Sequence, residues 1–349
     1  MAAPSLRTRP TDLGSPAAPV PVEARSLSFD RIREAGRIVA EQLGPTPLQQ
    51  HPLLDADASI GRPLLVKHEN VLPTGSFKVR GGVHLAATLT GEERRAGLIT
   101  CSTGNHAQSV AYAARLAGTR ATIVMPSSAP VVKRDAVAAL GAEVVIAGET
   151  LGEAAAAARA RAGEGRGAFV CPTDARIVLG HATAYLEIFT ELAALGIDPS
   201  AVHVPIGSGT GAAGACLVRD ALAPRCRVIG VQSSAAPAAW RSWRSGRLES
   251  AASSTRASGL ATTVGYALPQ AVLRARLDDF VLVDDDLIDA AARLLALRAH
   301  TLAEGAGAAS LASVLALGVS GAEGPAGIEV VVCTGANASA DEIARLVAA

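Results

Sequence analysis

The sequence predicts an α/β protein with mostly parallel sheets, covered by helices on both faces and divided between two domains. Short apolar runs rich in β-branched residues alternate with helical patterns along most of the chain, which is typical of parallel sheets that are buried on both faces. At 349 residues the chain is also longer than a single core usually grows, so we expect two domains.

The alternation can be followed element by element. Apolar residues at helical spacing run from Phe29 to Leu43 and stop at Gly44-Pro45, where a helix would end. Asp284-Asp285-Asp286 is interpreted as a helix N-cap, because carboxylates accept hydrogen bonds from the first amides of a helix. Strands are expected at 63–67, 98–101, 121–125, 143–146, 168–170, 202–206, 228–231 and 330–333, and helices at 106–117, 131–140, 151–162, 185–195, 212–221, 287–300 and 308–317.

Composition and charge narrow the function classes. The 32 acidic residues balance 32 basic residues, so neither nucleic acid nor an anionic membrane is an expected partner. The five cysteines show no CxxC spacing, which predicts buried reduced thiols in a cytoplasmic protein rather than a zinc site or a disulfide framework. Residues 1–28, rich in Ala, Pro, Ser and Arg, predict a disordered tail without a signal peptide, and no transmembrane helix is expected.

Lys78 is the leading candidate for a reactive group. The chain has 32 basic residues but only three lysines, Lys67, Lys78 and Lys133. Arginine replaces lysine as a solvated charge, whereas only lysine can lose its proton and form an imine with an aldehyde cofactor. Lys78 follows the turn 74–77 at the predicted start of a helix. Because a lysine near a helix start is usually exposed to solvent, this hypothesis depends on the residues around it.

Three loops that follow predicted strands can hold a bound group, since functional groups in parallel sheets gather at the carboxyl ends of strands. The loop 102–106 would leave free backbone amides at a helix start, where a carboxylate or phosphate can bind. The glycine-rich loop 207–211 would let backbone amides converge on a phosphate. Thr334, after the last strand, offers a hydroxyl to a ring nitrogen.

The glycine-rich loop leaves one alternative open. Gly209, Gly211 and Gly214 fit the G-x-G-x-x-G fingerprint of dinucleotide-binding proteins, so an NAD-dependent oxidoreductase is a competing hypothesis. That fingerprint requires an acidic residue about 20 positions further on, which holds the ribose. The following strand leads to Gln232 and carries no carboxylate there, which argues against NAD.

Together these motifs resemble the fold-type II pyridoxal-phosphate enzymes, which have the tryptophan synthase β-like fold, and most closely the threonine/serine dehydratase family, to which serine racemase is related. The resemblance runs in the same order from about residue 45 to residue 340. It implies two open, twisted, mostly parallel α/β domains with a cofactor cleft between them. The large domain would comprise 29–81 and 179–349, the small domain 82–178, and the protein would form a homodimer. The matching segments are 67–70, 74–82, 102–108, 207–211, 304–308 and 334–337.

The resemblance also implies an activity and a role for each matching residue. The activity would be that of an ammonia-lyase, or dehydratase, which converts a β-hydroxy L-amino acid such as threonine or serine to a 2-oxo acid and ammonia. Lys78 would bond to pyridoxal 5'-phosphate and take the substrate α-proton. The remaining contacts would be Phe77 beside the cofactor ring, Asn105 at its 3-hydroxyl, Thr334 at its nitrogen, Gly207, Ser208, Gly209, Thr210 and Gly211 around its phosphate, and Ser102, Thr103, Gly104 and His106 around the substrate carboxylate.

Departures from the family pattern keep other activities open. Gln232 stands where many relatives carry a glutamate that helps to hold a divalent ion, so no metal site is expected. Ser258 stands where relatives commonly carry aspartate, a change that would alter cation binding or substrate contacts. Thr103 stands where racemases of this fold carry a serine base, which makes an amino-acid racemase the nearest alternative. A β-replacement synthase would share every cofactor residue, and a catalytically silent binding protein would keep the fold without needing Lys78.

Overall fold

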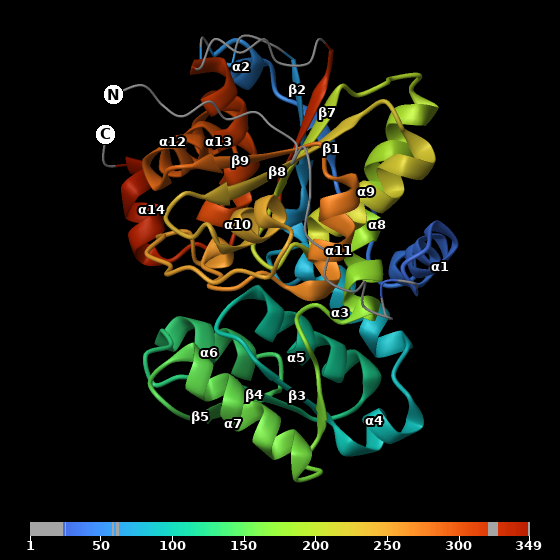
Figure 1. Cartoon of the computed structure of the whole chain (residues 1–349), viewed down its shortest axis with the longest axis vertical. Helices are drawn as coiled ribbons and strands as arrows, with labels where there is room; N and C mark the ends of the chain where they lie inside the picture. Colours follow the sequence, from blue (N-terminus) through green and yellow to red (C-terminus); the bar gives the residue numbers. More distant parts are fainter. Residues whose placement is uncertain (1–23, 25, 58, 61–62, 320–326, 348–349) are drawn as a thin grey trace.

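The computed structural model describes residues 24, 26–57, 59–60, 63–319 and 327–347, which form two stacked bodies in Figure 1. The tail predicted at 1–28 lies outside the described residues except near its end. There, Leu27 is buried, and the Ser28 hydroxyl accepts a hydrogen bond from the Arg31 amide in the first turn of α1 (Phe29–Ala40). The end of the predicted tail therefore belongs to the fold, because it caps and covers the first helix.

The upper body in Figure 1 contains a six-stranded sheet in the order β1-β2-β10-β7-β8-β9. Every pairing is parallel except that of β1 with β2. Parallel neighbours need crossover connections, which place helices on both faces of the sheet. The strands are β1 (Leu48–Gln50), β2 (Leu64–His68), β7 (Ala201–Pro205), β8 (Arg227–Ser233), β9 (Asp279–Val283) and β10 (Glu329–Cys333).

Two hydrophobic clusters cover the two faces of this sheet. The first draws on α1 and on α8 (Ala175–Ala194), α9 (Thr210–Leu222), α10 (Ala238–Ser245) and α11 (Ala267–Arg276). The second draws on α2 (Pro52–Asp55), α12 (Asp285–Arg298) and α13 (Gly305–Val319). The last helix of the chain is α14 (Ala340–Val347). The predicted helix cap is present, since the Asp284 carboxylate accepts a hydrogen bond from the Leu287 amide.

The lower body contains a four-stranded parallel sheet in the order β5-β4-β3-β6. One face of this sheet packs on α5 and the other on α7. Its strands are β3 (Leu98–Cys101), β4 (Ala121–Met125), β5 (Glu143–Ile146) and β6 (Ala168–Phe169). Its helices are α4 (Gly91–Ala96), α5 (Asn105–Ala117), α6 (Val131–Ala138) and α7 (Leu151–Gly163). The predicted fold class, two mostly parallel α/β sheets covered by helices, is confirmed.

The largest error in the predicted elements concerns α8, which begins at Ala175 rather than at 185. Its first half is buried on nearly all sides against α3 (Lys78–Ala87) and α9, so it shows no amphipathic period. The packing is close enough that a Cβ atom added to Gly180 would lie 2.5 Å from the Arg80 carbonyl oxygen. Strands β1 and β9 and helices α2, α4, α10, α11 and α14 were not predicted.

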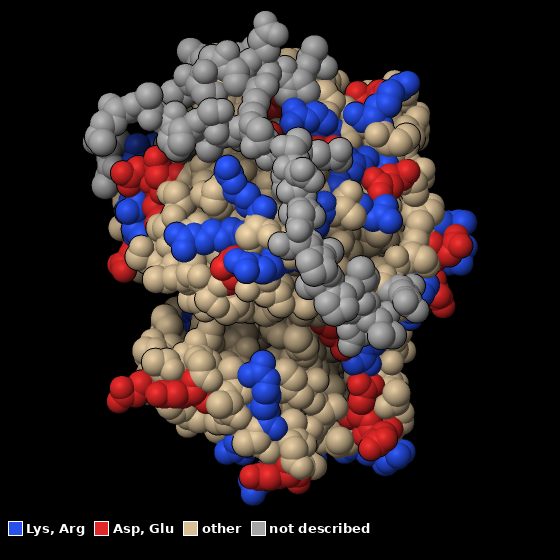
Figure 2. All heavy atoms as spheres, in the orientation of Figure 1, with Lys and Arg blue, Asp and Glu red and all other residues tan. Residues whose placement is uncertain are grey.

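The two bodies are joined through α3 and α8. The predicted domain limits at 82 and 178 fall inside these helices, and the limits themselves stay a prediction. Figure 2 shows that the surface is hollowed where the bodies meet and that acidic and basic side chains are interspersed over this face.

Within the described residues, no helix has both the length and the apolar character that crossing a membrane requires.

Candidate active site

A cavity of about 200 Å³ lies between the two bodies, at the carboxyl ends of strands from both sheets. This is the edge at which parallel sheets place bound groups, because the loops after successive strands meet there. Every residue that the sequence analysis proposed for the site lines this cavity: Phe77, Lys78, Ser102, Thr103, Gly104, Asn105, His106, Gly207, Ser208, Gly209, Thr210, Gly211 and Thr334.

Lys78 begins α3, as predicted, and its turn is fastened to the end of β10. The Phe77 amide donates to the Thr334 carbonyl oxygen at 2.9 Å, and the Ala336 amide donates to the Gly75 carbonyl oxygen at 2.8 Å. Gly75 has φ +64°, a conformation that other residues rarely adopt. The backbone on both sides of Lys78 is therefore held at the cavity wall.

Burial changes the acidity of the Lys78 amine. Desolvation lowers its pKa from 10.5 to about 8, and the nearby Glu304 carboxylate opposes this change. The Nζ atom lies 5.0 Å from the centre of the Phe77 ring. A substantial fraction of Lys78 is consequently neutral near physiological pH, and a neutral amine is the form that attacks a carbonyl group or accepts a proton.

The glycine-rich loop also lines the cavity, at the N-terminus of α9. Gly209 has φ +87° and caps this helix, and a Cβ atom on Gly207 would lie 2.4 Å from the Gly259 carbonyl oxygen. The Thr210 hydroxyl is 2.9 Å from Nδ1 of His181, a buried histidine whose pKa desolvation holds well below its usual value. The amides and hydroxyls of this loop, at a positive helix end, form a site suited to phosphate.

The loop after β3 supplies the third wall. The Ser102 hydroxyl accepts a hydrogen bond from the Gly104 amide at 3.2 Å, just before α5 begins at Asn105. The His106 imidazole lies 3.1 Å from the Thr100 hydroxyl, and burial lowers its pKa to about 3. Its ring is thus neutral and engaged with β3, so a contribution of His106 to a carboxylate site would come from its backbone amide.

Glu304 is a site residue to which the sequence analysis assigned no role. Its Oε1 accepts a hydrogen bond from the Asn105 side-chain amide at 2.6 Å. The Asn337 side-chain amide in turn donates to Asn105 Oδ1 at 2.8 Å. Burial raises the pKa of Glu304 to about 7, and the hydrogen bond from Asn105 opposes this change. Glu304 comes immediately before the glycine-rich start of α13, and this position is the feature of the sequence that could have identified it as a site residue.

We expect Glu304 to make the cofactor-free protein less stable as the pH rises. Because its folded-state pKa of about 7 exceeds the ordinary value of 4.5, its stabilising contribution is complete below 4.5 and is lost as the pH rises through 7. The loss is about 3 kcal/mol, at 1.36 kcal/mol for each unit of pKa. Urea unfolding from pH 4.5 to 8 should show this loss in the wild type and not in Glu304→Gln, which keeps an oxygen for Asn105 and cannot ionise. If the free energy of unfolding changed with pH in the same way in both proteins, the role assigned to Glu304 would be contradicted.

Beside the cavity, a buried ion-pair network supports the helix that carries Lys78. Arg80 donates to Glu69 through Nε at 2.6 Å and to Glu187 through a terminal guanidinium nitrogen at 2.6 Å. Lys67 donates to Glu187 at 2.7 Å and to the Thr46 carbonyl oxygen at 2.8 Å. Lys67 is therefore a buried structural cation, which leaves Lys78 and Lys133 as the lysines that line the cavity.

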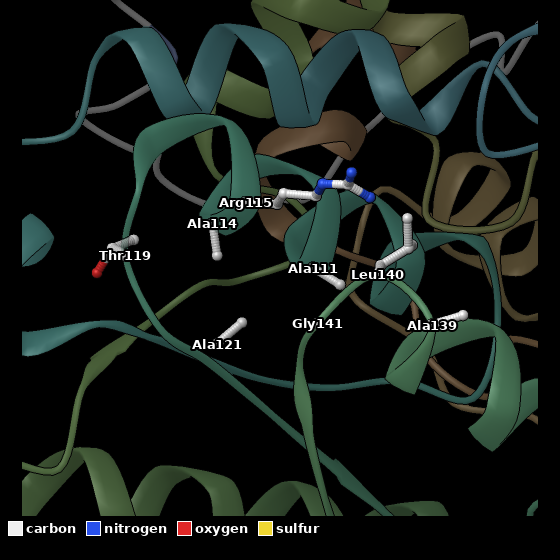
Figure 3. Close-up of a pocket in the computed structure, with 8 residues that line it drawn as sticks. All are labelled: Ala111, Ala114, Arg115, Thr119, Ala121, Ala139, Leu140 and Gly141. Carbon is white, nitrogen blue, oxygen red and sulfur yellow. The ribbon is translucent and has the colours of Figure 1, made fainter.

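Other parts of the described structure offer weaker candidates. Figure 3 shows a second pocket, on the lower body, whose labelled side chains are mostly short and apolar, with Arg115 and Thr119 at its sides.

Gln232 stands where a metal ligand was considered. It is buried, and its Oε1 accepts a hydrogen bond from the Trp240 backbone amide at 3.0 Å, so this position holds an amide rather than a carboxylate. The described residues contain no group of three or more His, Cys, Asp or Glu side chains arranged to hold a metal ion.

The cavity also contains residues that the sequence analysis did not place there: Lys133, Leu151, Pro172, Ser258, Gly259, Leu260, Thr262 and Tyr266. They follow strands β4, β5, β6 and β8 and come from both bodies. No local motif marks them, because their positions depend on how the two sheets face each other.

Comparison with known proteins agrees with this geometry. A family model described as pyridoxal-phosphate dependent enzyme matches residues 39–335. The chain is 37% identical over 292 residues to the L-threonine ammonia-lyase of Thermotoga maritima, covering 83% of this chain and 71% of that protein. It is 39% identical over 259 residues to the L-threonine ammonia-lyase of Geobacter sulfurreducens, covering 73% of this chain and only 63% of that protein.

Solved structures show the same relationship. The crystal structure of T.th. threonine deaminase superposes with a TM-score of 0.83 at 35% identity, covering 90% of this chain and 99% of that one. Maize serine racemase superposes with a TM-score of 0.84 at 26% identity, covering 91% and 96% of the two chains. The match over residues 39–335, together with a lysine and a glycine-rich loop in one cavity, shows that the chain belongs to the family of pyridoxal-phosphate dependent enzymes.

Proposed function

We propose that the protein is a pyridoxal-phosphate dependent ammonia-lyase that converts a β-hydroxy L-amino acid, such as threonine or serine, to a 2-oxo acid and ammonia. The observation that carries this proposal is a half-buried lysine of lowered pKa that lines the same cavity as the glycine-rich loop at the start of α9. The threonine ammonia-lyases at 37% and 39% identity support the choice of reaction.

The residues present fit the cofactor. The Lys78 amine would bond to its aldehyde, the loop 207–211 would hold its phosphate, and the Thr334 hydroxyl would face its ring nitrogen. A Cβ atom on Gly211 would lie 3.2 Å from both the Phe77 ring and the Tyr185 hydroxyl, so the loop packs closely against these two side chains. When bound, the cofactor supplies an electron sink that makes the substrate α-proton removable.

The chain's own groups would perform the remaining steps. The backbone amides and hydroxyls of 102–104, at the N-terminal end of α5, would bind and orient the substrate carboxylate. Lys78 Nζ, neutral in a substantial fraction of molecules, would take the α-proton. Enclosure between the two bodies would exclude water during the loss of the β-hydroxyl.

A product assay tests the reaction type. The purified holoenzyme, incubated with L-threonine and L-serine, should release 2-oxo acid and ammonia in equal amounts. An amino-acid racemase, the alternative suggested by Thr103, would give the D-amino acid instead, and a β-replacement synthase would need a second nucleophilic substrate. D-Amino acid without 2-oxo acid would reject the lyase.

Further features of the proposal come from the family resemblance. We propose the division into a large domain, 29–81 with 179–349, and a small domain, 82–178. We also propose a homodimer in the cytoplasm. Size-exclusion chromatography with light scattering tests the homodimer, and a monomeric mass would reject it.

A further inference from the structure

Two histidines outside the cavity direct their ring nitrogens at each other. His51 is the N-cap residue of α2 and His68 is the last residue of β2, and their Nε2 atoms lie 2.9 Å apart. The two rings are close to perpendicular, at 76°, with centroids 5.1 Å apart. His68 is buried and His51 is half-buried, so solvent reaches the pair on the side of His51.

Both imidazoles are neutral at physiological pH. Burial lowers the pKa of His68 to about 4, and the charges of His51 and Lys67 act in the same direction. Burial also lowers the pKa of His51. A neutral imidazole has a proton on one ring nitrogen and a free lone pair on the other, and this is the form that binds a metal ion. The two rings can therefore share one hydrogen between them, or both can direct a lone pair at a common ion.

The separation of the two nitrogens selects the kind of ion. A metal–imidazole bond measures about 2.0–2.1 Å, so two nitrogens on one ion lie about 2.9 Å apart at an angle of about 90° and about 3.3 Å apart at the tetrahedral angle. The observed 2.9 Å matches neighbouring positions of a square-planar or octahedral ion. Imidazole ligands in a tetragonal arrangement are preferred by Cu²⁺ and Ni²⁺, whereas Mg²⁺ and Ca²⁺ prefer oxygen ligands.

The charges beside the pair are compatible with a cation. The negative charge of Asp55 acts to raise the pKa of His51, and it would attract a metal ion for the same reason. The Asp55 carboxylate accepts hydrogen bonds from the Leu64 amide at 2.9 Å and from the Gln50 side-chain amide at 2.6 Å, which hold it in place. A third imidazole, the exposed His300, is near enough that its charge acts to lower the pKa of His51.

We propose that His51 and His68 form a binding site for a divalent transition-metal ion, for which Cu²⁺ and Ni²⁺ have the fitting geometry, with water in the remaining positions. Two protein ligands agree with the absence, in the part of the chain that the structure describes, of a larger group of metal-binding side chains. The site is separate from Gln232 and from the cavity, and it does not depend on the proposed lyase activity. Because only the folded chain brings the two rings together, the ion should also stabilise the fold.

Copper binding to the holoenzyme tests the site. In calorimetry, His51→Gln should weaken Cu²⁺ binding by at least about 10- to 100-fold, since losing a metal ligand costs no less than losing a group that orients one. Cu²⁺ should raise the thermal unfolding midpoint of the wild type and not that of the variant. We expect His51→Gln to fold, because the His51 side chain makes no capping hydrogen bond to α2.

Electron paramagnetic resonance identifies the ligands. With one equivalent of Cu²⁺, the wild-type spectrum should be that of a tetragonal ion coupled to two imidazole nitrogens, and His51→Gln should lose this coupling. His84→Asn is the matched control, because His84 and His68 are both 4% exposed and asparagine keeps a donor for the Arg176 carbonyl oxygen, 2.7 Å from His84 Nδ1. It should leave the affinity and the spectrum unchanged. Mg²⁺ should show no binding that depends on His51.

Three results would overturn the inference. One is equal affinity of the wild type and His51→Gln for Cu²⁺, which would assign the ion to the bound cofactor or to another group that the variant retains. Another is a copper spectrum without coupling to two imidazole nitrogens. The third is no binding by the wild type, which would leave the two histidines as a hydrogen-bonded pair. If His51→Gln does not fold, His68→Gln provides the same comparison.

Discussion

Replacing Lys78 with alanine should abolish the ammonia-lyase activity, with a fall in kcat of at least about 10³-fold. This value lies within the roughly 10²–10⁴-fold that a positioned acid or base contributes, and loss of the covalent bond to the cofactor adds to it. Lys78 lines the cavity at the start of α3, and its lowered pKa leaves a usable neutral amine. The measurements are 2-oxo acid formation and the visible absorbance of the purified protein. The variant should lack the absorbance band of a lysine-bound cofactor.

Two controls separate chemistry from folding. Lys78→Arg keeps the positive charge but cannot lose its proton, so it should be as inactive as the alanine variant. The cofactor-free alanine variant should unfold in urea at a midpoint equal to or above that of the wild type, since it removes an amine whose charge is disfavoured by burial. Turnover by Lys78→Arg at more than about one tenth of the wild-type rate would contradict the role assigned to the amine.

Replacing Arg80 with alanine should destabilise the protein by roughly 3–5 kcal/mol, because it leaves buried carboxylates without their partner. Arg80 and Glu69 have fully buried side chains, and Glu187 is 24% exposed. Their contacts join α3 to the 3-10 helix η2 (Glu69–Val71), which directly follows β2, and to α8. We therefore also expect weaker cofactor retention at a temperature where the variant remains folded.

An exposed ion pair provides the matched comparison. Arg225 pairs with Asp198 at the surface, with side chains that are 84% and 49% exposed. Arg225→Ala should lower the midpoint of urea unfolding much less than Arg80→Ala, because solvent screens an exposed ion pair. The midpoint of urea unfolding measures both variants. Equal losses in the two variants would show that the Arg80 network does not stabilise the fold.

Much of the fold could be predicted because its signals are local. The apolar runs at 121–125 and 143–146 form β4 and β5 with those bounds. Strand β4 is apolar on both faces because it is buried, whereas β5 lies at the sheet edge and is marked by its β-branched residues. The turn before Lys78 and the glycines before α9 also act locally, through the backbone conformations they permit. The first half of α8 could not be predicted, because burial on all sides removes the helical period.

The sequence by itself determined which residues follow the strands, and hence that the loops with Lys78, Ser102, Gly207 and Thr334 would lie at the carboxyl edges of their sheets. Only the tertiary structure decided the electrostatics of the cavity between those edges. Lys78 and Glu304 are far apart in the sequence, yet each shifts the pKa of the other. Lys133 reaches Ser258 because the two bodies face each other. The physical reason is that burial and distance between charges set these properties, and neither exists until distant segments pack together.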